Sequence, residues 1–389
     1  MLKEIGSNFW QNIEKPDNVF TSTDNLQENM KKKLNEELDH ISGSDVAFFS
    51  LGRAAIEFAL IDIAQERAGC KKIDNDGEIR KYIYNVVVPS YVCDTVIDPA
   101  IKHNIPITPY DINLDLELTG EQLASVIETN HADVVIFHQY YGFETAPTIL
   151  PVIEKYRNKG VKFIEDRTQN MFSHFKHLPV DYVVGSFRKW GAIADGGFCA
   201  KQVDKFCIDK PIEQDKEAVK NKDRAFRLKY AYMEYNKGNK DDFLKAYRVA
   251  ENTLNSERHF YRMSDYSMYT FLNHFDVEKV KKIRIANYKT IYELIFENNN
   301  INILTKTPNE EDVPLYITFV SDNRDEIQLM LRNQDIYAPI IWPRPSNMMR
   351  LSDTVEHIYK SVLSLPIDQR YGKDDMERMA KAINGYRMN

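Results

Sequence analysis

Polar and charged side chains recur directly after short apolar runs of the sequence. These runs are apolar without strict alternation, which is typical of strands covered on both faces of a sheet. In open α/β sheets, ligands bind beyond the carboxyl ends of the strands. We therefore expect one edge of a sheet to collect these polar groups, which are Gly52, Arg53, Ser90, Tyr91, His138, Glu165, Asp166, Gln169, Ser186 and Lys189.

The types of these residues fit a phosphorylated pyridine aldehyde. Ser50-Leu-Gly-Arg-Ala-Ala opens a predicted helix, whose free N–H groups suit a phosphate, and Ser186 can add a hydroxyl donor. Asp166 ends an apolar strand, where a carboxylate is costly unless it faces a cation such as a protonated pyridine nitrogen. Lys189 follows the next strand and supplies a nucleophilic amine. Together these groups are what pyridoxal 5′-phosphate (PLP) requires.

Each of these residues also has an ordinary structural explanation. A glycine that opens a helix is usually part of a turn, and an aspartate after a strand is usually an N-cap. A lone lysine is usually solvated. The prediction of a PLP site therefore depends on the order of the residues along the chain and not on any one of them.

The elements that would position these residues alternate between strands and helices. This alternation is typical of βαβ units and a largely parallel sheet. The predicted strands cover residues 47–50, 85–89, 134–138, 162–166, 181–186 and 198–201, with helices at 54–67 and 149–159. A polar N-terminal arm precedes them and contains one charged helix near 25–40.

The second half of the chain shows a different residue pattern, with apolar residues mostly at helical spacing. Residues 203–254 predict two or three amphipathic helices with a turn at Gly238-Asn239, which we interpret as a packed helical insertion and not a cofactor element. A long helix at 264–298 follows, then a strand at 315–319 and helices at 325–333 and 373–383. We expect an arm (1–45), a large PLP-binding domain (46–208), the insertion (209–257), and an inter-domain helix with a small C-terminal α+β domain (258–389).

Composition limits the classes of partner. The chain has 389 residues, with 51 Lys and Arg against 58 Asp and Glu, a net charge of −7. This balance argues against a nucleic-acid binder but leaves room for an anionic small molecule. Four cysteines without a C-x-x-C pair predict neither a metal site nor a secreted disulfide framework. Without a signal peptide or an apolar run of ~20 residues, we expect a cytoplasmic protein with no membrane partner.

Several stretches resemble the DegT/StrS-type aminotransferases, PLP enzymes of fold type I that mostly aminate keto-sugars carried on nucleotides. The resemblance covers about residues 47–205 and 261–383. It is carried by Ser50-Leu-Gly-Arg-Ala-Ala, Val87-Val-Pro-Ser-Tyr-Val, Glu165-Asp-Arg-Thr-Gln, Gly185-Ser-Phe-Arg-Lys-Trp-Gly-Ala-Ile-Ala-Asp-Gly-Gly-Phe, Tyr261-Arg-Met-Ser and Leu363-Ser-Leu-Pro.

The resemblance implies a fold, an assembly and residue roles. The fold would be the PLP-dependent transferase fold type I, a mostly parallel seven-stranded sheet with a smaller C-terminal α+β domain. The chain would form a homodimer with its sites at the subunit interface. Lys189 would form the Schiff base with PLP, Asp166 would pair with the pyridine nitrogen, and Gln169 would contact the phenolic oxygen. Ser186 and the Gly52-Arg53 backbone would hold the phosphate.

The sequence also departs from the family pattern. Cys93 stands where the family has a stacking aromatic residue, so either Tyr91 supplies the ring or it packs elsewhere. Phe260 replaces an Asn that reaches the partner subunit's phosphate. Arg53, where Thr is common, either replaces that phosphate contact or is a surface residue. Only Phe187 and Arg188 separate Ser186 from Lys189, where the family commonly has more residues.

Two further residues are candidates for substrate contacts. His138 at a strand end would orient substrate or shuttle protons, and Arg370 would suit an anionic substrate. Structural roles are equally consistent with the sequence for both.

The expected activity is amino transfer, with glutamate as the donor implied by the resemblance, to a keto-sugar that is nucleotide-linked. A PLP enzyme of the same fold with a non-sugar carbonyl or amine substrate is an alternative, and so is a homologue that has lost catalysis. A dinucleotide-binding domain ranks last, because no Gly-x-Gly-x-x-Gly sequence follows a strand.

Overall fold

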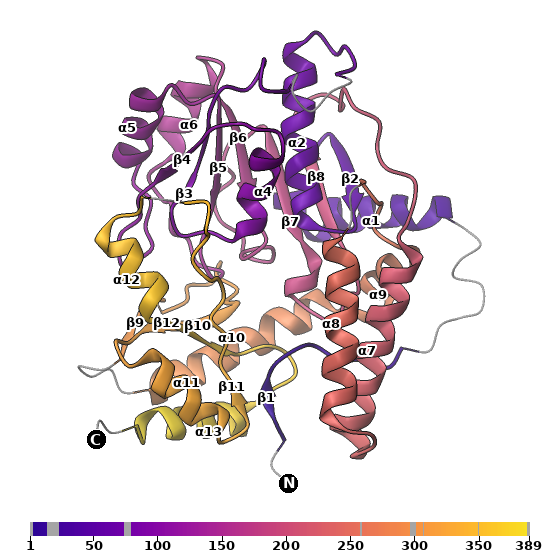
Figure 1. Cartoon of the computed structure of the whole chain (residues 1–389), viewed down its shortest axis with the longest axis vertical. Coiled ribbons are helices and arrows are strands. Elements are labelled where there is room, and N and C mark those ends of the chain that lie inside the picture. Colours follow the sequence, from indigo (N-terminus) through magenta and orange to yellow (C-terminus); the bar gives the residue numbers. More distant parts are fainter. Residues whose placement is uncertain are drawn as a thin grey trace. The chain divides into compact units, whose positions relative to one another are not determined.

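The chain passes back and forth between two compact units in the computed structural model (Figure 1). Unit 1 comprises Met1–Ser7, Asn75–Val180 and Val277–Asn389, and unit 2 comprises Asn8–Asp74 and Asp181–Asp276. The structure describes residues 3–13, 23–73, 79–256, 259–295, 301–305, 307–348 and 350–386. The predicted segment 46–208 contributes to both units, so the spatial division crosses the expected boundaries at 45 and 208.

Seven strands form the large sheet in the order β2-β8-β7-β6-β5-β3-β4. Unit 1 supplies the parallel strands β3 (Val86–Pro89), β4 (Ile107–Tyr110), β5 (Val134–His138) and β6 (Lys162–Asp166). Unit 2 supplies β2 (Asp45–Phe49), β7 (Tyr182–Ser186) and β8 (Gly197–Lys201), with β8 antiparallel to both of the others. The predicted α/β fold class with a seven-stranded, mostly parallel sheet is confirmed.

Burial explains which strands the sequence revealed. Every residue of β3, β5, β7 and β8 is buried, so these strands appear in the sequence as unbroken apolar runs. The sequence did not predict β4, which lies at the edge of the sheet and contains Pro109. Proline lacks an N–H for the ladder and is tolerated at such edges.

Among the described residues, the remainder of unit 1 contains two smaller sheets and seven helices. A three-stranded antiparallel sheet has the order β12-β10-β9, and β1 pairs with β11 in parallel. These strands are β1 (Ile5–Gly6), β9 (Asn302–Ile303), β10 (Tyr316–Val320), β11 (Ile336–Tyr337) and β12 (Val362–Pro366). The helices are α4 (Asp94–Lys102), α5 (Gly120–Asn130), α6 (Leu150–Arg157), α10 (Val277–Leu294), α11 (Arg324–Arg332), α12 (Asp353–Ser361) and α13 (Lys373–Asn384).

The single long helix predicted at 264–298 is wrong, because the chain forms two helices there. α9 (Asp265–His274) belongs to unit 2, and α10 begins at Val277 in unit 1. Phe275 adopts an extended backbone (φ −117°, ψ 101°), and its ring stacks on Phe271 at a centroid distance of 5.2 Å. The extended backbone at Phe275 ends α9 at a point that no proline or glycine marks. Residues 296–298 of the predicted helix lie outside the described residues.

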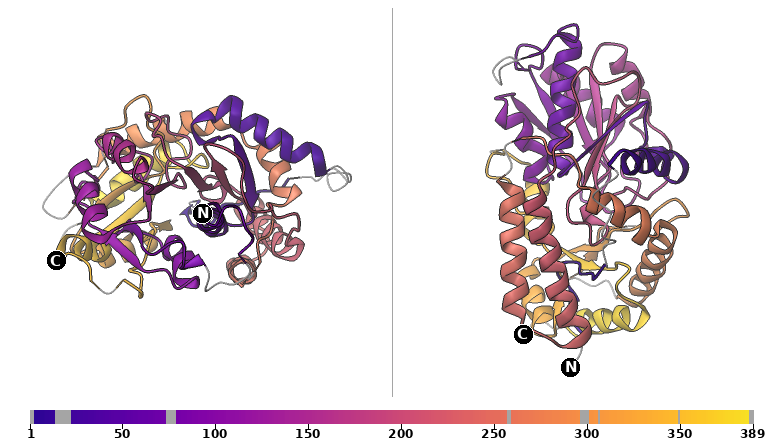
Figure 2. Two further views of the ribbon diagram at one scale, coloured as in Figure 1. Left: turned by 90° about the horizontal axis from the view of Figure 1, so that it is seen from above. Right: turned by 90° about the vertical axis from the view of Figure 1, so that its right-hand side faces the viewer.

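Two long helices of unit 2 form the predicted helical insertion. α7 (Lys216–Tyr235) and α8 (Lys240–Asn255) lie side by side as an antiparallel pair (Figures 1 and 2). Phe226, Phe243 and Tyr247 pack in their shared apolar cluster. Asn236 ends α7 in the left-handed region, and the Asn239 side chain caps α8. The prediction of two or three amphipathic helices with a turn at Gly238 is confirmed, with two helices formed.

The other helices of unit 2 are α1 (Thr23–Glu37), the 3₁₀ turns η1 (Asp39–Ile41) and η2 (Phe187–Lys189), and α2 (Gly52–Arg67). α1 agrees with the charged helix expected near 25–40. Within unit 2, α2 packs against β2, β7 and β8. Its start therefore lies in the same unit as the segment that carries Ser186 and Lys189.

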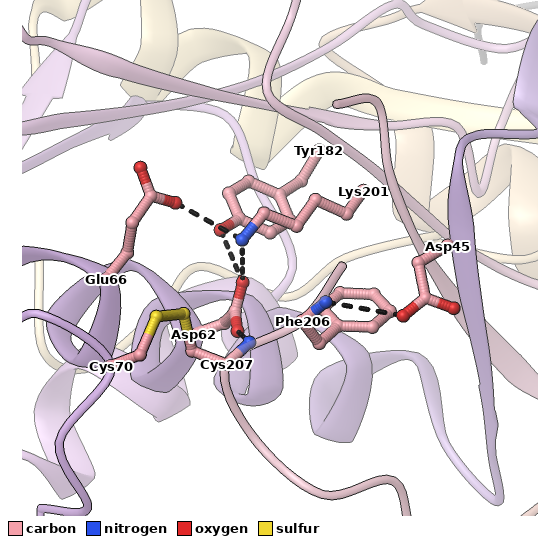
Figure 3. Close-up of a disulfide and its surroundings, with 8 residues drawn as sticks. All are labelled: Asp45, Asp62, Glu66, Cys70, Tyr182, Lys201, Phe206 and Cys207. Atoms are coloured by element: carbon pink, nitrogen blue, oxygen red, sulfur yellow. Dashed lines mark hydrogen bonds and ion pairs between the residues drawn. A yellow bond between two sulfur atoms is a disulfide. The ribbon is translucent and has the colours of Figure 1, made fainter. Parts of the chain in front are cut away.

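A buried carboxylate fixes α2 to the strands below it (Figure 3). Asp62 is 0% exposed, and its Oδ2 accepts hydrogen bonds from the Tyr182 hydroxyl (2.7 Å) and from Lys201 Nζ (2.8 Å). Its Oδ1 accepts one from the backbone N–H of Cys207 (2.6 Å). Burial lowers the pKa of Lys201, but Asp62 and Glu66 outweigh it and raise that pKa above its ordinary value. α2 is thus held to β7, to β8 and to the loop that follows β8.

A disulfide joins Cys70, just beyond α2, to Cys207 in that same loop (Figure 3). The two cysteines are 137 residues apart, so no local sequence pattern indicated that they pair. This single bond differs from the framework of several disulfides found in small secreted proteins, which the cysteine count argued against. Among the described residues, no helix combines the length and the apolar character needed to cross a bilayer.

Candidate functional site

The residues predicted to form the site divide between the two units. Unit 1 carries Tyr91, His138, Asp166, Gln169 and Arg370, and unit 2 carries Gly52, Arg53, Ser186 and Lys189. Each set is therefore described within its own unit.

Two strand ends in unit 1 place His138 and Asp166 opposite each other. The two residues are register partners at the carboxyl ends of the parallel strands β5 and β6, and both are buried. Asp166 Oδ1 accepts a hydrogen bond from the backbone N–H of Thr168 (2.9 Å). The carboxylate thus stabilises the turn after β6, and this bond fixes its direction; a turn and not a helix follows, so Asp166 is not the N-cap that its ordinary explanation predicts.

Gln169 presents an oriented amide to the same edge. Its Oε1 accepts a hydrogen bond from the backbone N–H of Tyr141 (2.8 Å), so its Nε2 must point the other way. That Nε2 is buried and has no hydrogen-bond partner in the part of the chain that the structure describes. A buried donor without a partner is costly, and a ligand oxygen would satisfy it. The phenolic oxygen of PLP is such an acceptor, so this residue fits the predicted cofactor.

The His138 imidazole is kept neutral. Burial lowers its pKa to about 3, and its ring contacts Tyr140 (centroids 4.4 Å apart) and Trp342 (5.3 Å) edge to face. Its buried Nε2 has no partner among the described residues. A group with this pKa does not exchange protons readily near neutral pH, which favours the orienting role over the proton shuttle.

Tyr91 packs within an aromatic cluster of unit 1. It is 0% exposed, and its ring lies parallel to that of Tyr140 and edge-on to Trp342 and Tyr359. Its hydroxyl shares a 2.8 Å hydrogen bond with that of Tyr141. Tyr140 and Trp342 also contact His138, so Tyr91 belongs to the aromatic cluster around that residue, and its role toward a cofactor stays a prediction.

Arg370 is committed to an internal ion pair. Its Nε and Nη2 donate to the two carboxylate oxygens of Asp368, at 2.6 and 2.8 Å. Burial alone raises the pKa of Asp368, but Arg370 outweighs it and holds that pKa below its ordinary range. The Arg370 side chain also donates to the carbonyl of Ser7. This geometry supports a structural role, since the planar donor face is already paired.

The start of α2 forms an anion cradle in unit 2. Leu51 occupies the N-cap position and has no side chain that could cap the helix, so the first N–H groups keep their capacity for a ligand. A Cβ on Gly52 would lie 3.2 Å from Cβ of Ser186. A Cβ on Gly197 would lie 2.6 Å from the Leu51 carbonyl. The two glycines thus let β7 and β8 approach the helix start closely.

Ser186 and Arg53 flank this cradle. Ser186 is buried, and its Oγ donates to the carbonyl of Gly196 (3.1 Å), which leaves the oxygen lone pairs available. Arg53 Nη2 donates to the carbonyl of Leu254 in the last turn of α8 (3.1 Å). The sequence analysis considered this guanidinium as a phosphate ligand. One of its nitrogens instead donates a hydrogen bond to the helical insertion.

Lys189 is the last residue of η2, the turn that directly follows β7. Its side chain is exposed, whereas Phe187 and Trp190 of the same segment are buried. Its amine forms no hydrogen bond or ion pair with any residue in the described ranges. Phe187 packs its ring against Phe271 at a centroid distance of 4.7 Å. The amine is therefore accessible, as the predicted nucleophilic role needs.

Sequence reasoning missed a charge cluster beside this lysine. Arg188 and Lys222 both hydrogen-bond Glu251, which joins η2 to α7 and α8. Burial, with Arg188 and Lys189 nearby, lowers the pKa of Lys222 to about 8. Burial raises the pKa of Glu251, but the two cations bring it down to about 2. The only sequence signal was the presence of charged residues next to the buried positions of two amphipathic helices.

Comparison with known proteins defines the fold. No protein-family model matches the sequence, and no curated protein is detectably similar to it. Among solved structures, the sugar aminotransferase CalS13 from Micromonospora echinospora superposes with a TM-score of 0.67 at 13% identity, covering 97% of this chain and 99% of CalS13.

Two further structures give the same result. A DegT DnrJ EryC1 StrS aminotransferase from Brucella abortus gives a TM-score of 0.61 at 15% identity, covering 92% of this chain and 90% of its own. DesI, solved in the presence of its TDP-sugar product, gives 0.62 at 14% identity, covering 99% and 93%. The chain therefore has the fold of PLP-dependent aminotransferases of fold type I, as its sequence motifs predicted.

Proposed function

We propose that this protein is a PLP-dependent aminotransferase that transfers an amino group, with glutamate as donor, to a nucleotide-linked keto-sugar. The observation that carries the proposal is the oriented amide donor of Gln169, which has no partner among the described residues and follows the strand-end carboxylate of Asp166 by three positions. The full-length likeness to aminotransferase structures supports it, because one of them was solved with a TDP-sugar product. A homodimer with sites at the subunit interface is part of the proposal.

Several residues of this chain are proposed to hold the cofactor. Asp166 would keep the pyridine nitrogen protonated, and Gln169 Nε2 would donate to the phenolic oxygen. The N–H groups at the start of α2 and the Ser186 hydroxyl would bind the phosphate. When bound, PLP supplies an aldehyde for exchange of amines and an electron-withdrawing ring.

Lys189 is the proposed catalytic residue. Its Nζ would hold the cofactor covalently at rest and give way to the incoming amine. The released amine would then serve as general base and acid, moving a proton between the substrate carbon and the aldehyde carbon of the bound cofactor. The neutral His138 imidazole would orient the substrate through hydrogen bonding.

Reduction with borohydride followed by peptide mass mapping tests the cofactor assignment. We expect a pyridoxyl adduct on Lys189 in the wild-type protein and none on that peptide in Lys189→Ala. No adduct, or an adduct on a different lysine, would contradict the proposal. Glutamate with a panel of keto-sugar nucleotides and simple oxo-acids then tests the substrate class. Amination of oxo-acids alone would favour the non-sugar alternative, and an adduct without any turnover would favour the inactive homologue.

A further inference from the structure

The last turn of α8 binds arginines from two segments that are proposed to contact the cofactor. Arg188 of η2 donates through Nη2 to both carboxylate oxygens of Glu251, at 2.8 and 2.9 Å. Arg53, the second residue of α2, donates to the carbonyl of Leu254 at 3.1 Å. Cations near a helix C-terminus are stabilised by the exposed carbonyl groups there. One turn of the helical insertion thus fastens both the proposed phosphate cradle and the turn that carries Lys189.

Glu251 is charged throughout the working pH range and neutralises more than one cation. Its pKa of about 2 results from Arg188 and Lys222, which outweigh burial. The Lys222 side chain is buried on α7, with its ammonium near the rings of Phe226 and Tyr247. Without Glu251, two partly buried cations would face each other beside Lys189, which is an unfavourable arrangement.

The backbone of η2 does little to fix Lys189 by itself. The turn is three residues long, and the N–H of Trp190 donates to the carbonyl of Phe187 (3.1 Å). Phe187 holds one side of the turn through its aromatic contacts with Phe198 and Phe271. The next residue, Arg188, holds the other side through Glu251. Lys189 follows directly, so its direction depends on both anchors.

We propose that Glu251 is a positioning residue for Lys189, acting through Arg188, and that the helical insertion is therefore part of the cofactor site. The inference rests on the proposed function, in which Lys189 is the reactive amine. It assigns a role to α7 and α8 that their amphipathic pattern did not suggest.

Glu251→Gln tests this role with the rate at which Lys189 is trapped. Apo protein is mixed with saturating PLP and cyanoborohydride, and the pyridoxyl-Lys189 peptide is quantified over time. A hydrogen bond to a charged group corresponds to about a tenfold effect or more, so we expect the trapping rate constant to fall about tenfold. Asp241→Asn, an exposed carboxylate at the other end of α8, is the matched control and should match the wild type.

The form of the trapping curve separates positioning from loss of folded protein. Unfolded molecules lower the final labelled amount, whereas a misplaced amine lowers the rate constant at an unchanged final amount. Glu251→Gln leaves Lys222 without its carboxylate, so Glu251→Gln/Lys222→Met provides a variant without that buried charge. We expect the same slow trapping in the double variant.

A double-mutant cycle with Arg188→Gln tests whether Glu251 acts through Arg188. The two substitutions together should slow trapping no more than either one alone, because both remove the same contact. Additive effects, or wild-type rates in Glu251→Gln, would overturn the inference while leaving the proposed function intact. Absence of label on Lys189 in the wild type would instead overturn the proposed function.

Discussion

Replacing Asp62 by Asn should strongly destabilise unit 2 and thereby the start of α2. Asp62 is fully buried and accepts hydrogen bonds from Tyr182, Lys201 and the backbone of Cys207 (Figure 3). Asparagine has nearly the same shape but no charge, and its NH₂ group would face one of these donors. The substitution therefore leaves the Lys201 ammonium in a buried position without its closest counter-charge.

The expected magnitude follows from the burial of the pair. Removing one partner of a buried ion pair costs about 3–5 kcal/mol. Glu66 stays 3.2 Å from Lys201 and is 35% exposed, so it compensates for part of the loss. We therefore expect Asp62→Asn to lower the free energy of unfolding by about 3 kcal/mol. Glu66→Gln removes only the half-exposed partner and should cost less than about 1 kcal/mol.

The assay is urea unfolding of the oxidised apo protein at neutral pH, followed by tryptophan fluorescence. A Trp342→Phe background leaves Trp10 and Trp190, both in unit 2, so the signal reports that unit alone. A change of less than about 1 kcal/mol in Asp62→Asn would refute the reasoning. An equal loss in Glu66→Gln would refute it as well, because the buried contact would then carry no special weight.

Two further predictions concern ionisation and the disulfide. The pKa of Lys222 is about 8 in the folded protein against 10.5 for an ordinary lysine, so the unfolded chain binds more protons between these values. Its stabilising contribution is thus present above pH 10.5 and lost as the pH falls through 8. Relative to Lys222→Met, the wild type should gain up to ~1.4 kcal/mol of unfolding free energy per pH unit from pH 8 to 10, and a constant difference in urea titrations would contradict this. For the Cys70–Cys207 bond, a separation of 137 residues gives up to ~5 kcal/mol of chain-entropy stabilisation, so reduction should lower the urea midpoint markedly. Thiol titration of the denatured, unreduced protein should find only the thiols of Cys93 and Cys199, and four reactive thiols would show that the bond does not form.

The sequence was most informative where local pattern and burial agree. The strands that carry His138, Asp166 and Ser186 are buried on both faces, so each appears as an apolar run with a polar residue at its end. The topological rule for α/β sheets then directs attention to those ends. The amphipathic spacing of α7 and α8 was equally clear, because one face of each helix packs on the other.

Long-range contacts were beyond the reach of the sequence. Tyr91 is enclosed by Trp342 and Tyr359, which come from a segment some 250 residues away in the chain, so its role could not be decided locally. Arg370 was ambiguous for the opposite reason. Its partner Asp368 is only two residues away, but the bidentate geometry that commits the guanidinium appears only in the folded turn.

The short connection between Ser186 and Lys189 and the presence of the helical insertion are best understood together. A single 3₁₀ turn with two intervening residues has few backbone hydrogen bonds with which to fix the side chain of Lys189, the proposed reactive amine. One of the two intervening residues, Arg188, hydrogen-bonds Glu251 of α8. Apolar contacts with α7 in turn hold α8 in place. Removing α7 and α8 would therefore leave Arg188 without its Glu251 partner and Arg53 without its carbonyl partner. On this argument the direction of the short η2 turn depends on the carboxylate at position 251, although that residue is 63 positions from Arg188 in the sequence.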